Sequence, residues 1–160
     1  MRMPRTLRVL ALGVTAALMA TTAVASSQSR PFTVVIDGNA SPVFTGPCTI
    51  ENTETGTGHA THMGTITWKS TENVDACGPV TIVRASFTIT STTGEQVNGT
   101  YDTVAELNFA TSEVRAAGLF TITGGTGRFV NASGEGVVNA EGSLLPPFGV
   151  IGHLTGTIDF

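Results

Sequence analysis

The sequence has little charge, a single Trp and a single Tyr, and no helix-favouring stretch after its first 25 residues. Charged residues make up 12% of the 160, and 8 Lys and Arg face 12 Asp and Glu. Without a basic excess to neutralise phosphates, nucleic-acid binding is excluded. Because runs rich in Ala, Leu, Glu and Lys are missing beyond the start, a helical bundle is excluded as well. The length suits one domain and is too short for two ordinary ones.

Residues 1–25 have the pattern of a secretory signal peptide. Three arginines precede an uncharged apolar run, and the small residues Ala23 and Ala25 occupy the positions that a signal peptidase reads. A membrane anchor is the alternative, but the apolar run is shorter than the about 20 residues that a spanning helix needs. We therefore expect cleavage after Ala25 and a secreted, extracellular domain over 26–160. That domain keeps five of the eight basic residues and all twelve acidic ones, a formal charge of −7, and we expect no membrane association after cleavage.

The chain has only two cysteines, Cys48 and Cys77. In an exported protein, one such pair predicts one disulfide bond. Closing a loop of about 30 residues would stabilise the fold by roughly 3–4 kcal/mol. A redox or nucleophilic thiol is the alternative, which the lack of a C-x-x-C motif disfavours.

Gly and Thr are abundant, and short β-type runs alternate with turn residues from about residue 32 to the C-terminus. Most runs carry apolar residues on one face and Thr on the other, as in a sheet that is covered on one side. About eight strands at regular spacing predict an all-β fold, an antiparallel sandwich or barrel. The clearest runs cover 32–37, 58–70, 80–90, 97–109, 114–123, 135–142 and 150–160, with a further run near the turn at 46–47.

A glycine-rich stretch over 120–136, FTITGGTGRFVNASGEG, is the most informative local motif. Its glycines would permit positive φ and tight curvature, and Phe129 would fill apolar space beneath the turn. The motif resembles the strand–turn–strand signature of allene oxide cyclase and dirigent-like β-barrels, which include small secreted bacterial proteins of unknown function. The segment 58–64, GHATHMG, is similar to a second segment that these small bacterial proteins often carry. The residues of the structural turn motif are Gly124, Gly125, Gly127, Phe129 and Gly134.

The resemblance implies a single closed or nearly closed barrel of eight antiparallel strands with a central cavity. It transfers no activity, because the matching residues are turn and packing residues. His62, Trp68 and Tyr101 fall on the apolar faces of their predicted strands, and we take them as the candidate ligand pocket. The alternative is that these three side chains simply fill the core.

Other patterns of reactive residues are weak. His59 and His62 fall on opposite faces of a strand, so a zinc site with His153 is disfavoured and we expect no metal. Arg84, Arg115 and Glu135 could take part in acid–base chemistry only if their side chains pointed into the barrel. The alternation of apolar and polar residues places the two arginines on the polar faces of their strands. No carboxylates are paired by the sequence, no catalytic residue can be assigned, and no motif indicates a cofactor.

Three functions remain open. The chain could bind a small apolar ligand inside the barrel, or be a cyclase or isomerase on the same fold. It could also be an extracellular structural or interaction protein with a solid core. A C-terminal Phe160 also occurs in outer-membrane barrels, but their aromatic girdles do not fit a chain with one Trp and one Tyr. The sequence indicates no oligomeric state.

Overall fold

A computed structural model describes residues 28–160, so the predicted signal peptide lies outside the described residues. This part of the chain forms eight strands and one short 3₁₀ helix, η1. The elements in chain order are β1 (Arg30–Phe44), β2 (Thr49–Ala60), β3 (Gly64–Asp75), β4 (Thr81–Ser91), β5 (Gln96–Asn108), β6 (Glu113–Gly125), η1 (Gly127–Phe129), β7 (Ser133–Ser143) and β8 (Gly149–Asp159).

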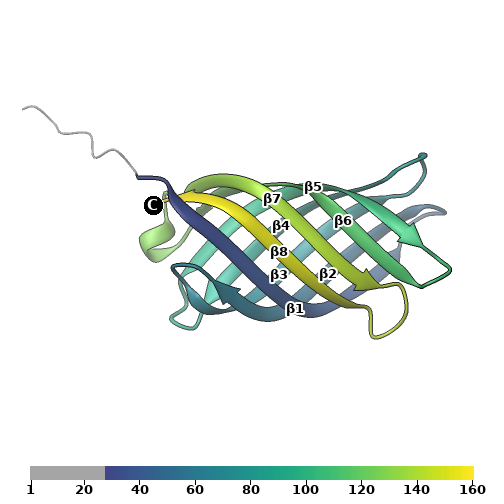
Figure 1. The fold of residues 1–160 in the computed structure, drawn as a ribbon, viewed down its shortest axis with the longest axis horizontal. Helices are drawn as coiled ribbons and strands as arrows, with labels where there is room; N and C mark the ends of the chain where they lie inside the picture. Colours follow the sequence, from purple (N-terminus) through teal and green to yellow (C-terminus); the bar gives the residue numbers. More distant parts are fainter. Residues whose placement is uncertain (1–27) are drawn as a thin grey trace, which may run out of the picture.

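The strands form one closed antiparallel barrel (Figure 1). Each strand pairs with the next along the chain, and β1 pairs with β8 to complete the ring. Closure leaves no unpaired sheet edge among these strands. The predicted all-β fold and the predicted barrel are therefore confirmed. Among residues 28–160, no helix has the length and apolarity needed to cross a membrane.

The predicted run over 58–70 is in fact two strands joined by a turn. His62 has φ 66° and Gly64 has φ 72°, and this left-handed backbone breaks the alternation between Ala60 and Gly64. The sequence pattern placed His62 on the same inward face as Trp68. In the structure the His62 side chain is instead exposed at the turn. Alternation resumes in β3, where Ile66, Trp68 and Ser70 are buried.

One end of the barrel, here called the closed end, is filled with large apolar side chains. It carries the start of β1, the end of β8, and the β2–β3, β4–β5 and β6–β7 connections. Phe32 and Phe120 are buried inside it with ring centroids 6.3 Å apart. Phe129, on η1, is fully buried and contacts Phe160 at 4.7 Å between centroids. The prediction that Phe129 fills the space beneath the glycine turn agrees with this placement.

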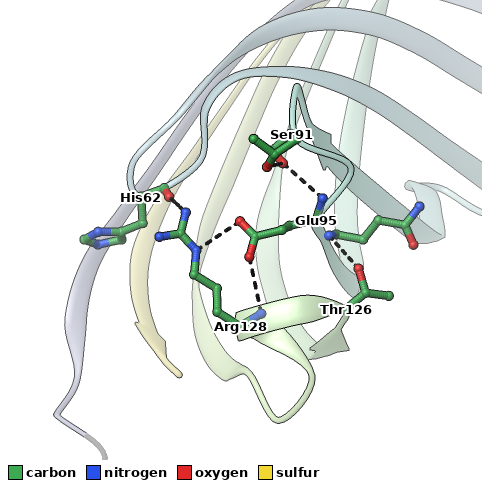
Figure 2. A network of polar contacts seen from close by, with 7 residues as sticks. His62, Ser91, Glu95, Thr126 and Arg128 are labelled. Atoms are coloured by element: carbon green, nitrogen blue, oxygen red, sulfur yellow. Dashed lines mark hydrogen bonds and ion pairs between the residues drawn. The ribbon is translucent and has the colours of Figure 1, made fainter.

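A polar network holds η1 over the closed end (Figure 2). The Arg128 side chain lies between two other turns: its Nε is 3.2 Å from Glu95 Oε2, and its Nη2 donates to the His62 carbonyl. The Arg128 amide also donates to Glu95 Oε1 at 3.3 Å. The Thr126 hydroxyl accepts from the Gln96 amide at 2.9 Å. The turns at this end are thus tied together, and His62 contributes its backbone to the closure.

The other end, here called the open end, carries the β1–β2, β3–β4, β5–β6 and β7–β8 connections (Figure 1). Cys48 in the first of these turns is bonded to Cys77 in the second, with their Cα atoms 5.1 Å apart. The predicted disulfide is confirmed. It links two neighbouring turns at the rim and contributes no side chain to the barrel interior.

Gly99 on β5 makes room for the Phe87 ring of β4. A Cβ at Gly99 would lie 2.4 Å from that ring and 2.4 Å from the Thr121 carbonyl oxygen. The register of β5 against β6 also shifts between Asn98 and Gly99, as at a β-bulge. Phe87 needs this space because it stacks against Trp68, with ring centroids 5.0 Å apart.

We predict that Gly99→Ala lowers the free energy of unfolding by about 1–3 kcal/mol, because the added methyl must displace Phe87 or the β6 backbone. Gly149→Ala is the matched control, since a Cβ there meets no atom within 4 Å. The control should change stability by no more than about 1 kcal/mol. Urea denaturation of both variants measures the difference, and equal losses would contradict the packing role of Gly99.

Replacing both cysteines by serine should lower the free energy of unfolding by about 3–4 kcal/mol, because the 29-residue separation sets the entropy of the opened loop. Denaturation of oxidised wild-type protein and of the Cys48→Ser/Cys77→Ser variant tests this expectation. A difference below about 1 kcal/mol would show that the unfolded chain gains little freedom from losing the bond.

Candidate functional site

A cavity of about 370 Å³ occupies the open half of the barrel. It exists because several inward positions there are Ala or Gly, whereas the closed half is filled by Phe and Ile. Most of its lining is apolar and comes from all eight strands, and Trp68 and Tyr101 are its buried aromatic residues. The small residues that leave this space open are Ala40, Ala105, Ala116, Ala140, Gly142 and Gly152.

Trp68 and Tyr101, both predicted as pocket residues, lie together in the cavity lining. Their ring centroids are 6.3 Å apart, and both rings stack with Phe87. His62, the third predicted pocket residue, is at the opposite end. Its Nε2 lies 3.0 Å from the Pro31 carbonyl oxygen, and its ring is 5.5 Å from Phe160. The structure thus brings two of the three predicted residues to one site.

A buried polar cluster faces the same cavity, centred on Glu72 of β3. The Tyr101 hydroxyl donates to Glu72 Oε1, and Asn52 Nδ2 donates to Glu72 Oε2 at 2.8 Å. Ser70 Oγ lies 3.4 Å from the Tyr101 hydroxyl and donates to Glu54 Oε2 at 3.4 Å. Two carboxyl groups, Glu54 and Glu72, therefore lie side by side inside the barrel.

Strand register explains why these residues meet. Asn52 pairs with Glu72, and Glu54 pairs with Ser70, across β2 and β3 on the inward face. Tyr101 lies two strands away and reaches Glu72 over Ala85, which is opposite both residues in the register of β4. Ala85 is small enough to leave that path open, so the cluster spans four adjacent strands.

The electrostatics of the pair follow from burial. Burial first, and then the neighbouring Glu72 carboxyl, raise the pKa of Glu54 from 4.5 to about 8, while Trp68 and Ser70 act to lower it. Burial also raises the pKa of Tyr101 above its usual range, so its hydroxyl remains a donor. Glu72 accepts two side-chain hydrogen bonds, from Tyr101 and from Asn52. Because the pKa of Glu54 is raised to about 8, Glu54 is mostly protonated near neutral pH.

Two buried polar atoms in the cavity lining lack hydrogen-bond partners within the described residues: Trp68 Nε1 and Thr103 Oγ1. Trp68 is 4% exposed and Thr103 is 5% exposed. The indole N–H lies near Glu54 and favours its charged form, but outside hydrogen-bond geometry. Buried polar groups normally form hydrogen bonds, so these two atoms are available to form hydrogen bonds with a molecule in the cavity.

The other reactive residues singled out in the sequence face outward. Arg84 pairs with Asp102 at 3.6 Å, and Arg115 pairs with Glu141 at 3.7 Å, both on the exposed surface. Glu135 is exposed as well. Among residues 28–160, no three His, Cys, Asp or Glu side chains are grouped so that they could hold a metal ion.

Sequence reasoning missed Glu54 and Glu72. The segment 49–57, TIENTETGT, is nearly devoid of apolar residues, so its strand alternation is hidden. A signal existed nonetheless: counting back from Ala60 by twos reaches Glu54 and Asn52. Counting forward from Trp68 by twos reaches Ser70 and Glu72. The sequence pattern therefore paired no carboxylates, whereas the structure brings these two together.

We predict that Glu54→Gln is stabilising above about pH 6 relative to wild type. The folded-state pKa of about 8 lies above the unfolded value of 4.5, so wild-type stability falls as pH rises between them. The glutamine variant loses this dependence, and its melting-temperature advantage should grow from pH 5 to pH 8. Glu51→Gln, on the outward face of the same strand, is the control. Parallel pH profiles for the two variants would contradict the burial of the Glu54 charge.

In comparisons with protein-family models, with curated proteins and with solved structures, none matches this chain. The likeness of its glycine motif to the allene oxide cyclase and dirigent-like barrels stays a prediction. What the protein does must be inferred from its own cavity, from the residues that line it and from their chemistry.

Proposed function

We propose that this protein binds a small, largely apolar molecule in the open half of its barrel. The observation that carries the proposal is the apolar cavity of about 370 Å³, which opens at one end of an otherwise filled barrel. Its volume lies in the range of roughly 300–1,000 Å³ that small-molecule sites occupy. A few polar groups on an apolar wall are the usual composition of such sites.

Exposed apolar residues at the open end support the same function. Phe44 is 74% exposed, Phe109 is 79% exposed and Leu145 is 57% exposed, and each lies at a different connection of this rim. Exposed apolar residues that gather at one place are typical of ligand-binding and interaction sites. A ligand entering from this side would pass over them before it reached the cavity.

The protein is also proposed to act outside the cell. The Cys48–Cys77 bond supports this, because disulfide bonds persist in oxidising compartments. The predicted signal peptide over 1–25 points the same way. A secreted barrel with a half-empty interior suits a role in capturing or carrying a ligand.

A cyclase or isomerase of the allene oxide cyclase-like type is the second candidate. The observation in its favour is the Glu54–Glu72 pair, in which one carboxyl holds a proton and its neighbour accepts hydrogen bonds. Such a pair can donate and accept a proton at one site. The solid-core structural protein is the least favoured, because the side chains fill only the closed half.

We predict that Ala116→Trp weakens binding of the neutral fluorescent dye N-phenyl-1-naphthylamine by about tenfold or more. Ala116 lines the cavity, and an indole there would occupy the ligand's space. Ala117→Trp is the matched control, one residue along the same strand and exposed on the outer face. Fluorescence titration of both variants gives the comparison, and circular dichroism checks their folding.

Native mass spectrometry of the exported wild-type protein should also show a discrete mass that is lost on denaturation. If wild type neither carries such a mass nor binds the dye, the ligand-binding proposal is wrong. If an added ligand is instead recovered as an isomer of the same mass, the result supports the cyclase or isomerase function.

A further inference from the structure

The cavity holds two acidic side chains without a basic partner. Glu54 and Glu72 both line it, yet none of the Lys, Arg or His side chains among residues 28–160 does. The nearest basic groups in sequence, Lys69 and His59, are on outward faces and exposed. An unpaired charge in an apolar interior is expensive, so natural proteins rarely keep one without a counter-charge.

A proton on Glu54 allows the two carboxyl groups to lie close together. Burial and the Glu72 carboxyl both favour this protonated form of Glu54, and a bound cation could take the place of the proton. The donors beside Glu54 are arranged for the opposite state. The Ser70 hydroxyl already donates to Glu54 Oε2, and the Trp68 N–H is unpartnered nearby in the described structure. Both would stabilise an ionised Glu54 once a cation replaced the proton.

The surrounding surface suits an organic cation. Trp68 and Tyr101 line the cavity next to the two carboxyl groups, and aromatic rings attract ammonium groups. Most of the remaining lining is apolar and would hold a hydrocarbon body. Within residues 28–160 no three His, Cys, Asp or Glu side chains are grouped to hold a bare metal ion, and the mostly apolar lining would not replace the water shell of such an ion.

We infer that the cavity's occupant is an apolar molecule with a basic amine, whose ammonium group binds between Glu54 and Glu72; this inference rests on the proposed ligand-binding function. On binding, the ammonium N–H groups donate to the two carboxylates and the proton of Glu54 leaves to solvent. The covalent structure of the ligand is unchanged. The net charge of the site is also unchanged, because the single positive charge of the ammonium group replaces that of the proton.

The groups that titrate at the site are few. Glu54 on β2, Glu72 on β3 and Tyr101 on β5 face one another. Strands β1, β4, β6 and β8 contribute no titratable side chain to the lining, and β7 contributes Glu141, which is ion-paired with Arg115 outside. Affinity for an amine should therefore rise from pH 6 to pH 8 as Glu54 loses its proton.

Isothermal titration calorimetry with octylamine, 1-octanol and octanoate tests the inference, because the three differ only in their head groups. At pH 8 wild type should bind octylamine at least about tenfold more tightly than 1-octanol, and octanoate most weakly. At pH 7, heats measured in buffers of different ionisation enthalpy should show release of about one proton with octylamine.

Two variants locate the effect. Glu54→Gln should abolish proton release and flatten the pH dependence, and Glu72→Gln should reduce the preference for octylamine over 1-octanol. Glu51→Gln, which alters an exposed carboxyl on β2, should behave as wild type. If Glu72→Gln does not fold, the comparison of head groups on wild-type protein still decides the question.

The outcomes separate the two proposals. If octylamine and 1-octanol bind equally well, the apolar cavity is functional and the amine inference is overturned. Tightest binding of octanoate, or octylamine binding without proton release, would overturn the inference in the same way. If neither the three ligands nor N-phenyl-1-naphthylamine binds, the proposed ligand-binding function is wrong, and the amine inference that rests on it is wrong as well.

Discussion

The pairing of β1 with β8 is the constraint on which the rest of this structure depends. It closes the sheet, so every strand has one face toward solvent and one face toward a shared interior. An inward residue must then either fill that interior or line what is left of it. The chain does both: large residues fill the closed half, and Ala and Gly leave the open half hollow.

The polar cluster lies where the filled and hollow halves meet. Trp68 and Tyr101 belong to both, since they stack on Phe87 and also line the cavity. Anchored in this way, the Tyr101 hydroxyl is fixed toward Glu72. The rigid half of the barrel therefore orients the groups that would meet a ligand, which is how well-formed binding sites are built.

At the open end, two turns are held together by a disulfide bond while several large apolar side chains are exposed. The Cys48–Cys77 bond ties two of its turns, while Phe44, Phe109 and Leu145 remain largely exposed around it. At the closed end, by contrast, Arg128 and Glu95 join the turns over buried phenylalanines. Burying the carboxyl groups of Glu54 and Glu72 costs stability, and the disulfide and the packed closed half offset that cost.

The sequence alone determined the strand-rich fold, its eight strands and the disulfide, because period-two alternation and a lone cysteine pair are local signals. It also placed Trp68 and Tyr101 on inward faces. It failed at His62, where a left-handed turn breaks the alternation. It also failed at Glu54, whose strand segment is nearly devoid of apolar residues, and at Glu72, which lies in the polar stretch 69–73 after Trp68. Only the tertiary structure decided that these carboxyl groups meet, because register across β2, β3, β4 and β5 brings together residues far apart in the chain.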